Sequence, residues 1–127
     1  MTKESLFLVV AAVGLTPIAL AYGLVPEVTA PMLYGIDIDS VSLAHVFRAV
    51  MGLYLAMVVF WILGATRDIL CFPALCSVAV FMGGLAVGRL VSLILDGMPE
   101  PLLVVYLVLE VGFTLVAVQL ARASRTE

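Results

Sequence analysis

Long apolar stretches separated by short polar breaks dominate the chain. Four of them match the length of a membrane-crossing helix, over residues of about 6–24, 41–65, 69–95 and 102–121. At ~1.5 Å of rise per residue, about 20 residues cross a ~30 Å hydrocarbon core. The breaks hold Pro, Gly, Asp and Glu, which are typical of turns. The pattern predicts an all-α, integral membrane four-helix bundle that forms a single transmembrane domain over residues 1–127.

The composition supports this interpretation. Hydrophobic residues make up 65% of the chain and charged residues 12%, whereas soluble domains are about half apolar and a quarter charged. A water-soluble fold of this size could not bury so much apolar surface, so the lipid bilayer is the expected partner. The formal net charge is −3 and the few Lys and Arg residues are scattered, which excludes a nucleic-acid-binding surface.

The first segment has an alternative interpretation as a signal peptide. Ala19-Leu20-Ala21 resembles a cleavage site, but Glu4 offsets the charge of Lys3 and the apolar run is long for such a peptide. We expect a membrane helix, and whether it is ever cleaved stays open. After it, Tyr34 is expected at headgroup level in a turn-rich loop, and Asp39 or Ser40 is expected to cap the second helix.

The distribution of positive charge predicts the orientation. In the predicted topology every Lys and Arg outside the apolar segments lies on one side, and the loops of the other side carry only acidic residues. Because Lys and Arg favour the cytoplasmic side, we expect both termini in the cytoplasm and the acidic loops outside. The residues that carry this prediction are Lys3, Arg67, Arg122 and Arg125.

Three charges, Arg48, Arg89 and Glu110, lie inside the apolar segments. Counted from the outer ends of their helices, they lie ~10, ~10 and ~13 Å deep, all on the same side. A charge in a membrane helix is costly and normally faces the bundle interior with a partner. We therefore expect Glu110 to pair with Arg89, with Arg48, or with both.

Four polar side chains extend this set toward the outer surface. His45 and Tyr106 lie about one turn above Arg48 and Glu110, while Ser92 and Asp96 share a helix face with Arg89. The set predicts an outward-facing pocket that binds or translocates a small polar or anionic ligand. Its residues are His45, Arg48, Arg89, Ser92, Asp96, Tyr106 and Glu110.

A structural role is the alternative, in which the charges only fix helix packing in a homo-oligomer or an accessory subunit of a membrane complex. Gly52 and Ala56, and the row Gly84, Gly88 and Ser92, have the small-x-x-x-small spacing that lets membrane helices approach. Ion or proton conduction, or an enzyme with Glu110 or His45 as acid or base, are further options. No catalytic signature is present, so no catalytic residue is assigned.

No metal or other cofactor is expected. Cys71 and Cys76 are five residues apart, which is neither a redox nor a metal-binding spacing. Thioethers suit Cu(I), but the methionines lack close spacing and are expected to pack in the apolar interior.

The motif Gly88-Arg89-x-x-Ser92-x-x-x-Asp96-Gly97-x-Pro99 is preceded by Arg48-Ala-Val-Met-Gly52-Leu-Tyr54 and followed by Glu110. In these features the chain resembles a family of small bacterial four-helix membrane proteins, catalogued as domain of unknown function 4345. The resemblance extends from the loop before the second helix to the end of the fourth. It implies the four-helix fold and a multi-pass location in the inner membrane, and it implies no biochemical activity.

Overall fold

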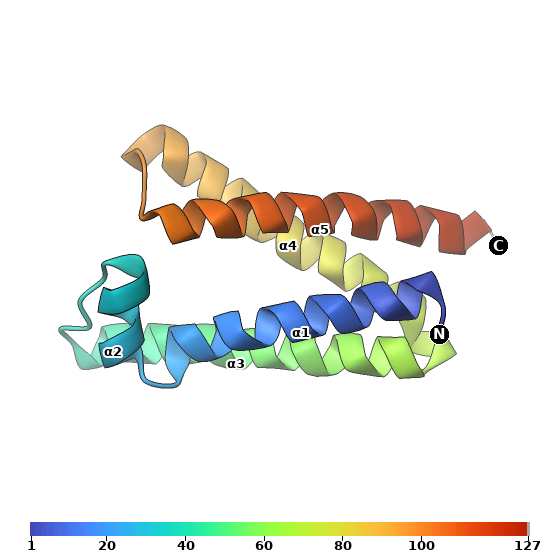
Figure 1. Ribbon diagram of the computed structural model, residues 1–127, viewed down its shortest axis with the longest axis horizontal. Helices are drawn as coiled ribbons and strands as arrows, with labels where there is room; N and C mark the ends of the chain where they lie inside the picture. Colours follow the sequence, from blue (N-terminus) through green and yellow to red (C-terminus); the bar gives the residue numbers. More distant parts are fainter. Residues whose placement is uncertain (127) are drawn as a thin grey trace.

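The computed structural model describes residues 1–126, and every regular element within them is helical (Figure 1). A short helix and a π-helical turn follow the first of four long helices. The elements in order are α1 (Lys3–Gly23), α2 (Pro26–Thr29), η1 (Ala30–Tyr34), α3 (Val41–Thr66), α4 (Asp68–Asp96) and α5 (Pro101–Thr126). The four long helices are apolar enough to cross a membrane, which indicates a multi-pass membrane protein and confirms the four predicted segments.

Local signals start and stop these helices. The Ser40 hydroxyl accepts a hydrogen bond from the Leu43 amide at 3.0 Å, which confirms one of the two expected caps of α3. Helix α4 ends at Gly97, whose φ of 94° is a conformation that side-chain-bearing residues rarely adopt. The turn that follows is short, so α5 folds back beside α4.

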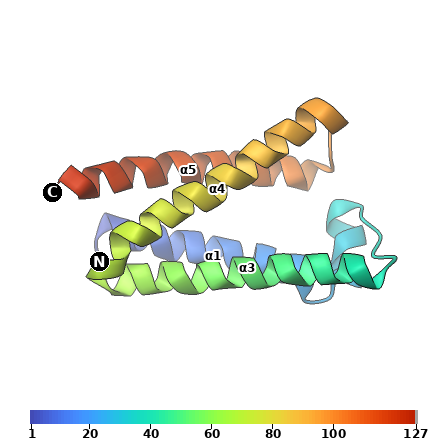
Figure 2. The ribbon, with the colours of Figure 1, turned by 180° about the vertical axis from the view of Figure 1, so that it is seen from behind.

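The long helices form two antiparallel hairpins, α1 with α3 and α4 with α5 (Figure 1). Both chain termini and the α3–α4 turn lie at one end, called the terminus end. Residues 24–40 and 97–100 lie at the other, called the loop end. Helix α4 leaves the α3–α4 turn beside α3 and runs diagonally away from it toward the loop end (Figure 2). The two hairpins are therefore closest at the terminus end and splayed at the loop end.

The tightest packing is near the terminus end. Leu8, Trp61 and Leu75 are fully buried there, and the Trp61 indole N–H donates to the Ser77 hydroxyl at 2.9 Å. Gly64 lies directly against Ala74, so the absence of a side chain lets α3 and α4 touch. This contact fixes the point from which α4 diverges.

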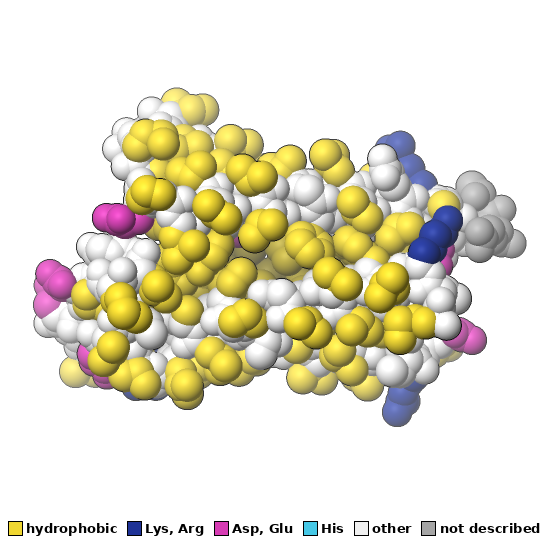
Figure 3. All heavy atoms as spheres, viewed as in Figure 1, with side chains coloured by type: hydrophobic (Ala, Val, Ile, Leu, Met, Phe, Trp, Pro, Cys, Tyr) yellow, Lys and Arg dark blue, Asp and Glu magenta, His cyan; other side chains and the backbone are white. Residues whose placement is uncertain are grey.

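The outward faces of the helices are apolar (Figure 3). Large hydrophobic side chains such as Val13, Val59, Val80 and Val108 are more than half exposed on the four long helices. A contiguous exposed apolar surface of this kind marks an interaction site, and on long apolar helices it suits lipid. Most Lys and Arg side chains visible in Figure 3 lie at the terminus end.

Candidate functional site

An ion pair joins α4 and α5 within their apolar spans. The Arg89 Nε donates to Oε1 of Glu110 at 2.8 Å, and the two side chains are 21% and 8% exposed. Arg89 lies seven residues before the end of α4 and Glu110 nine residues after the start of α5. Because a short turn joins two antiparallel helices, residues at similar distances from it lie opposite each other. The expected pairing of Glu110 with Arg89 is confirmed.

All four tyrosines of the protein gather around this pair, and we call them the tyrosine cluster. Tyr22 accepts a hydrogen bond from Nη2 of Arg89 at 3.2 Å, and the guanidinium carbon lies 5.7 Å from the centre of the Tyr106 ring. The hydroxyls of Tyr34 and Tyr106 share a hydrogen bond of 2.9 Å. The Tyr54 ring meets Tyr22 edge-on at 5.5 Å. Hydrogen bonds and cation–π attraction thus hold Arg89 from several sides.

The segment before α3 covers the tyrosine cluster from the loop end. Its Thr29 hydroxyl donates to the Ala21 carbonyl at 2.6 Å, which ties the segment back to α1. Tyr34 is only 3% exposed and stacks on Tyr22 at 4.9 Å, so its side chain packs inside the protein. Burial, and then the hydrogen bond to Tyr106, raise the pKa of the Tyr34 hydroxyl, which keeps it neutral.

Arg48 lies away from the ion pair, at the C-terminal end of α1. Its Nη1 donates to the carbonyl oxygens of Gly23 at 2.9 Å and Leu24 at 3.3 Å, and its Nη2 lies 3.8 Å from Glu27. Half of its side chain is exposed. Arg48 therefore satisfies the last carbonyls of α1, which have no partner within the helix. The expected contact between Arg48 and Glu110 is not formed.

Three other predicted site residues also lie outside the tyrosine cluster. His45 is exposed on α3 near Arg48 and lies outside the tyrosine cluster. The Ser92 hydroxyl donates to Oδ2 of Asp96 at 2.7 Å, and both residues are exposed at the end of α4. The structure thus brings together Arg89, Tyr106 and Glu110 and leaves the remaining four exposed, although Ser92 shares a cleft with Arg89.

A cleft of about 420 Å³ lies where α4 diverges from α3. Arg89, Ser92, Tyr22 and Tyr54 supply its polar lining, and aliphatic side chains of α3, α4 and α5 supply the rest. Gly84 and Gly88 also line it, and a Cβ atom at either position would meet nothing within 4 Å. Within residues 1–126, Gly84 and Gly88 therefore do not bring two helices together, because they border open space.

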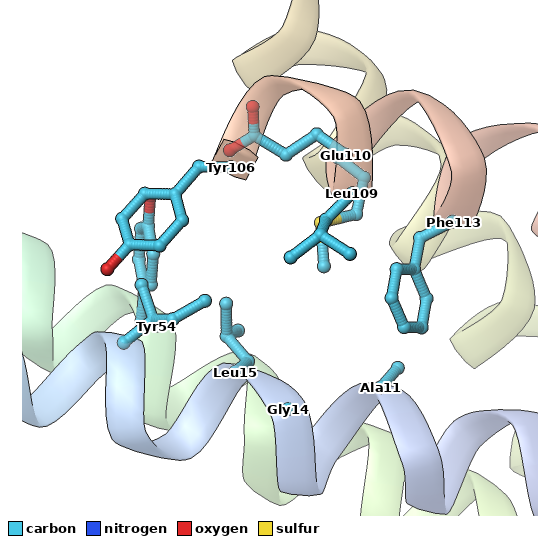
Figure 4. Close-up of a pocket in the computed structure, with 10 residues that line it drawn as sticks. Ala11, Gly14, Leu15, Tyr54, Tyr106, Leu109, Glu110 and Phe113 are labelled. Carbon is cyan, nitrogen blue, oxygen red and sulfur yellow. The ribbon is translucent and has the colours of Figure 1, made fainter. Parts of the chain in front are cut away.

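A second, smaller cavity of about 60 Å³ is lined by Glu110 together with residues of α1 and α5 (Figure 4). It opens between α1 and α5, where the surface in Figure 3 is hollowed. Leu15, Leu109 and Phe113 make most of its wall apolar, and Glu110 is its charged residue. Arg89 lines the large cleft and Glu110 the small cavity, so the ion pair lies in the wall between them.

Three members of the cluster, Tyr22, Tyr34 and Tyr54, were not expected from sequence. A signal was present, because interfacial aromatic residues normally occur at both membrane surfaces and no tyrosine lies near the terminus end. Within residues 1–126, no three His, Cys, Asp or Glu side chains are grouped to hold a metal ion. Both cysteines are free thiols.

Comparison with known proteins places the chain in a family. Searches of curated proteins and of solved structures found no match. A family model described as Domain of unknown function (DUF4345) matches residues 4–121. The match covers all four long helices up to Ala121 and includes the Arg89–Glu110 pair and the four tyrosines. This four-helix protein, with its tyrosine-surrounded ion pair, therefore belongs to the DUF4345 family.

Proposed function

We propose that this protein binds a small ligand inside the membrane, at Arg89 in the cleft between α3, α4 and α5. The observation that carries the proposal is the incomplete use of the Arg89 guanidinium. It has five N–H donors, and its two hydrogen bonds go to Glu110 and Tyr22. Three donors, five minus two, therefore have no partner among residues 1–126. The side chain lines a cleft of about 420 Å³, in which a ligand could accept from them. A volume of this size is typical of ligand sites.

The surroundings of Arg89 support binding because they fix the guanidinium before a ligand arrives. Glu110 holds Nε, Tyr22 holds Nη2 and the Tyr106 ring lies beside the guanidinium carbon. A binding group held by packing and by its own hydrogen bonds loses little freedom when it engages a ligand. The site is thus prepared for a hydrogen-bond acceptor.

The proposed setting is a bacterial inner membrane, with both termini in the cytoplasm and the loop end outside. The placement of Lys3, Arg67, Arg122 and Arg125 at the terminus end supports this orientation. The cleft then belongs to the outer half of the membrane.

An accessory role is the second candidate, and the row Gly84, Gly88 and Ser92 supports it. Among residues 1–126, a Cβ atom added at Gly84 or Gly88 would meet nothing within 4 Å, so a helix of another subunit or a second copy could pack against the row. Native mass measurement in mild detergent separates the two functions. A monomer without a protein partner contradicts the accessory role.

The ligand-binding proposal is tested by thermal unfolding of the purified protein in detergent with carboxylates, phosphate esters and uncharged carbonyl compounds. A true ligand at about 100 times its Kd adds roughly 2.7 kcal/mol of stability. Gly88→Leu, whose side chain enters the open cleft, should abolish the stabilisation, and Arg89→Gln should weaken it. Gly52→Leu is the matched control, because Gly52 also has open space around it but lies outside the cleft. Stabilisation that survives both cleft variants would reject the site.

A further inference from the structure

The cleft opens on the side of the molecule. Val50 and Tyr54 line it from α3, from which α4 diverges (Figure 2), and Gly84, Gly88 and Ser92 of α4 line it and are all exposed. These residues belong to a helix that is long and apolar enough to cross a membrane. If the protein binds a ligand at Arg89 as proposed above, this mouth faces hydrocarbon over most of its length.

Residues of η1 cover most of the site from the loop end. Ala30 and Tyr34 of η1 are buried against the tyrosine cluster, and Tyr34 is joined to Tyr106 by a hydrogen bond. The cleft reaches the loop end along one edge, at Gly97 and Pro99. A molecule that enters through the wide side mouth must partition into the bilayer first, so it must carry an apolar body.

The charge around Arg89 selects an uncharged acceptor. Glu110 lies 2.8 Å from the guanidinium and balances its charge, and Arg48, the second arginine at this depth, is engaged elsewhere. An anion bound to Arg89 would bring a second negative charge close to Glu110 in a poorly solvated place. A carbonyl oxygen can accept from Arg89 without that repulsion.

The lining of the cleft combines apolar and polar groups. Toward the terminus end its walls include Gly84, Leu85 and Leu107, and toward the loop end the Ser92 hydroxyl is accompanied by the apolar side chains of Leu93, Leu103 and Val104. Arg89 lies between the two parts. This lining matches a lipid-like molecule whose apolar chains contact the aliphatic walls and whose polar end lies at Arg89 and Ser92.

We propose that the ligand is an uncharged lipid that enters sideways from the bilayer and places a carbonyl oxygen on the N–H groups of Arg89. An ester lipid such as a diacylglycerol has this chemistry. The inference rests on the proposed function and adds the class of ligand and its route.

The experiment uses the full-length protein in phosphatidylcholine vesicles with two photoactivatable probes, a diacylglycerol and a fatty acid with the same chain. After illumination, the labelled residues are mapped by mass spectrometry. The diacylglycerol should label residues of the cleft, and unlabelled dioleoylglycerol should compete while triacetin, which has the ester groups without long chains, should not. Arg89→Gln should lower this labelling about tenfold, as expected for loss of hydrogen bonds from a charged donor. Gly88→Leu should abolish it and Gly52→Leu should leave it unchanged.

Each other outcome has a definite meaning. Labelling of the cleft by the fatty acid alone, sensitive to Gly88→Leu, would overturn the uncharged lipid and keep ligand binding at Arg89. Competition by triacetin equal to that of dioleoylglycerol would overturn the lipid-like body and the route through the bilayer. If neither probe gives labelling that Gly88→Leu abolishes, and no compound stabilises the protein in the thermal assay, both proposals are overturned. If Arg89→Gln does not fold, the pair of glycine variants carries the test, because neither removes the ion pair.

Discussion

Arg48 and Arg89 lie at similar depth in neighbouring helices, yet their partners differ because of the direction in which each points. Tyr54, six residues after Arg48, belongs to the tyrosine cluster and packs against Tyr22. Six residues turn a helix by about 600°, so the two side chains point about 120° apart. Arg48 consequently meets the end of α1 instead of Glu110. Depth alone therefore does not determine which charges pair.

The Arg89–Glu110 pair leads to a stability prediction at the residue scale. Glu110→Gln removes the carboxylate and leaves the largely buried guanidinium charge unbalanced. Breaking one partner of a buried pair costs on the order of 3 kcal/mol, so the free energy of unfolding in detergent should fall by about that amount.

Glu27→Gln is the matched control, because Glu27 and Arg48 are half exposed and 3.8 Å apart. An exposed pair of this kind contributes less than about 1 kcal/mol. Equal losses for the two variants would show that the Arg89–Glu110 pair is not shielded from solvent in the way described above.

At the scale of elements, the glycines divide into those that bring helices together and those that border space. Gly23 lies directly against Met51, and Gly64 lies against Ala74. A Cβ atom added at Gly52, Gly84 or Gly88 would meet nothing within 4 Å. The spacing of small residues therefore did not identify which helix faces are in contact, because spacing marks a face and not its neighbour.

Gly23→Ala tests the contact between α1 and α3. The added methyl would overlap Met51 and lie 2.9 Å from the Phe47 carbonyl oxygen, so the end of α1 must shift. Overpacking of this kind costs typically about 1–3 kcal/mol. Chemical denaturation in detergent should show that loss.

Gly112→Ala provides the comparison for this change, since Gly112 lies in α5 with open space around it. There the methyl should be neutral or slightly stabilising, by up to about 1 kcal/mol, through helix propensity. A Gly23→Ala protein as stable as Gly112→Ala would contradict the close contact.

At the scale of the whole molecule, the distance between the two hairpins increases from the terminus end to the loop end. They meet closely around Trp61, Gly64 and Ala74 at the terminus end and diverge toward the loop end. The segment before α3 fills part of the resulting space with Tyr34, and the cleft occupies the rest. The proposed site thus follows from the tilt of α4.

Orientation in the membrane is a prediction at this scale. In a protein with Cys71→Ser and Cys76→Ser, Asp37→Cys at the loop end should react with a membrane-impermeant maleimide added to intact cells. Ser124→Cys near the C-terminus should react only after the cells are made permeable. The positions of Lys and Arg are the physical reason. The reverse labelling pattern would overturn the proposed orientation.

The sequence by itself determined the four long helices, a cap of α3 at Asp39 or Ser40, and Arg89 as one of two possible partners of Glu110. Each of these depends on local chemistry or on one short turn, which sets the depth of residues on both sides. Tertiary structure alone decided the partner of Arg48, the gathering of the tyrosines, the burial of Tyr34 and the cleft beside Gly88. These depend on how each helix is rotated and tilted against helices distant in sequence, which no periodicity within one segment specifies.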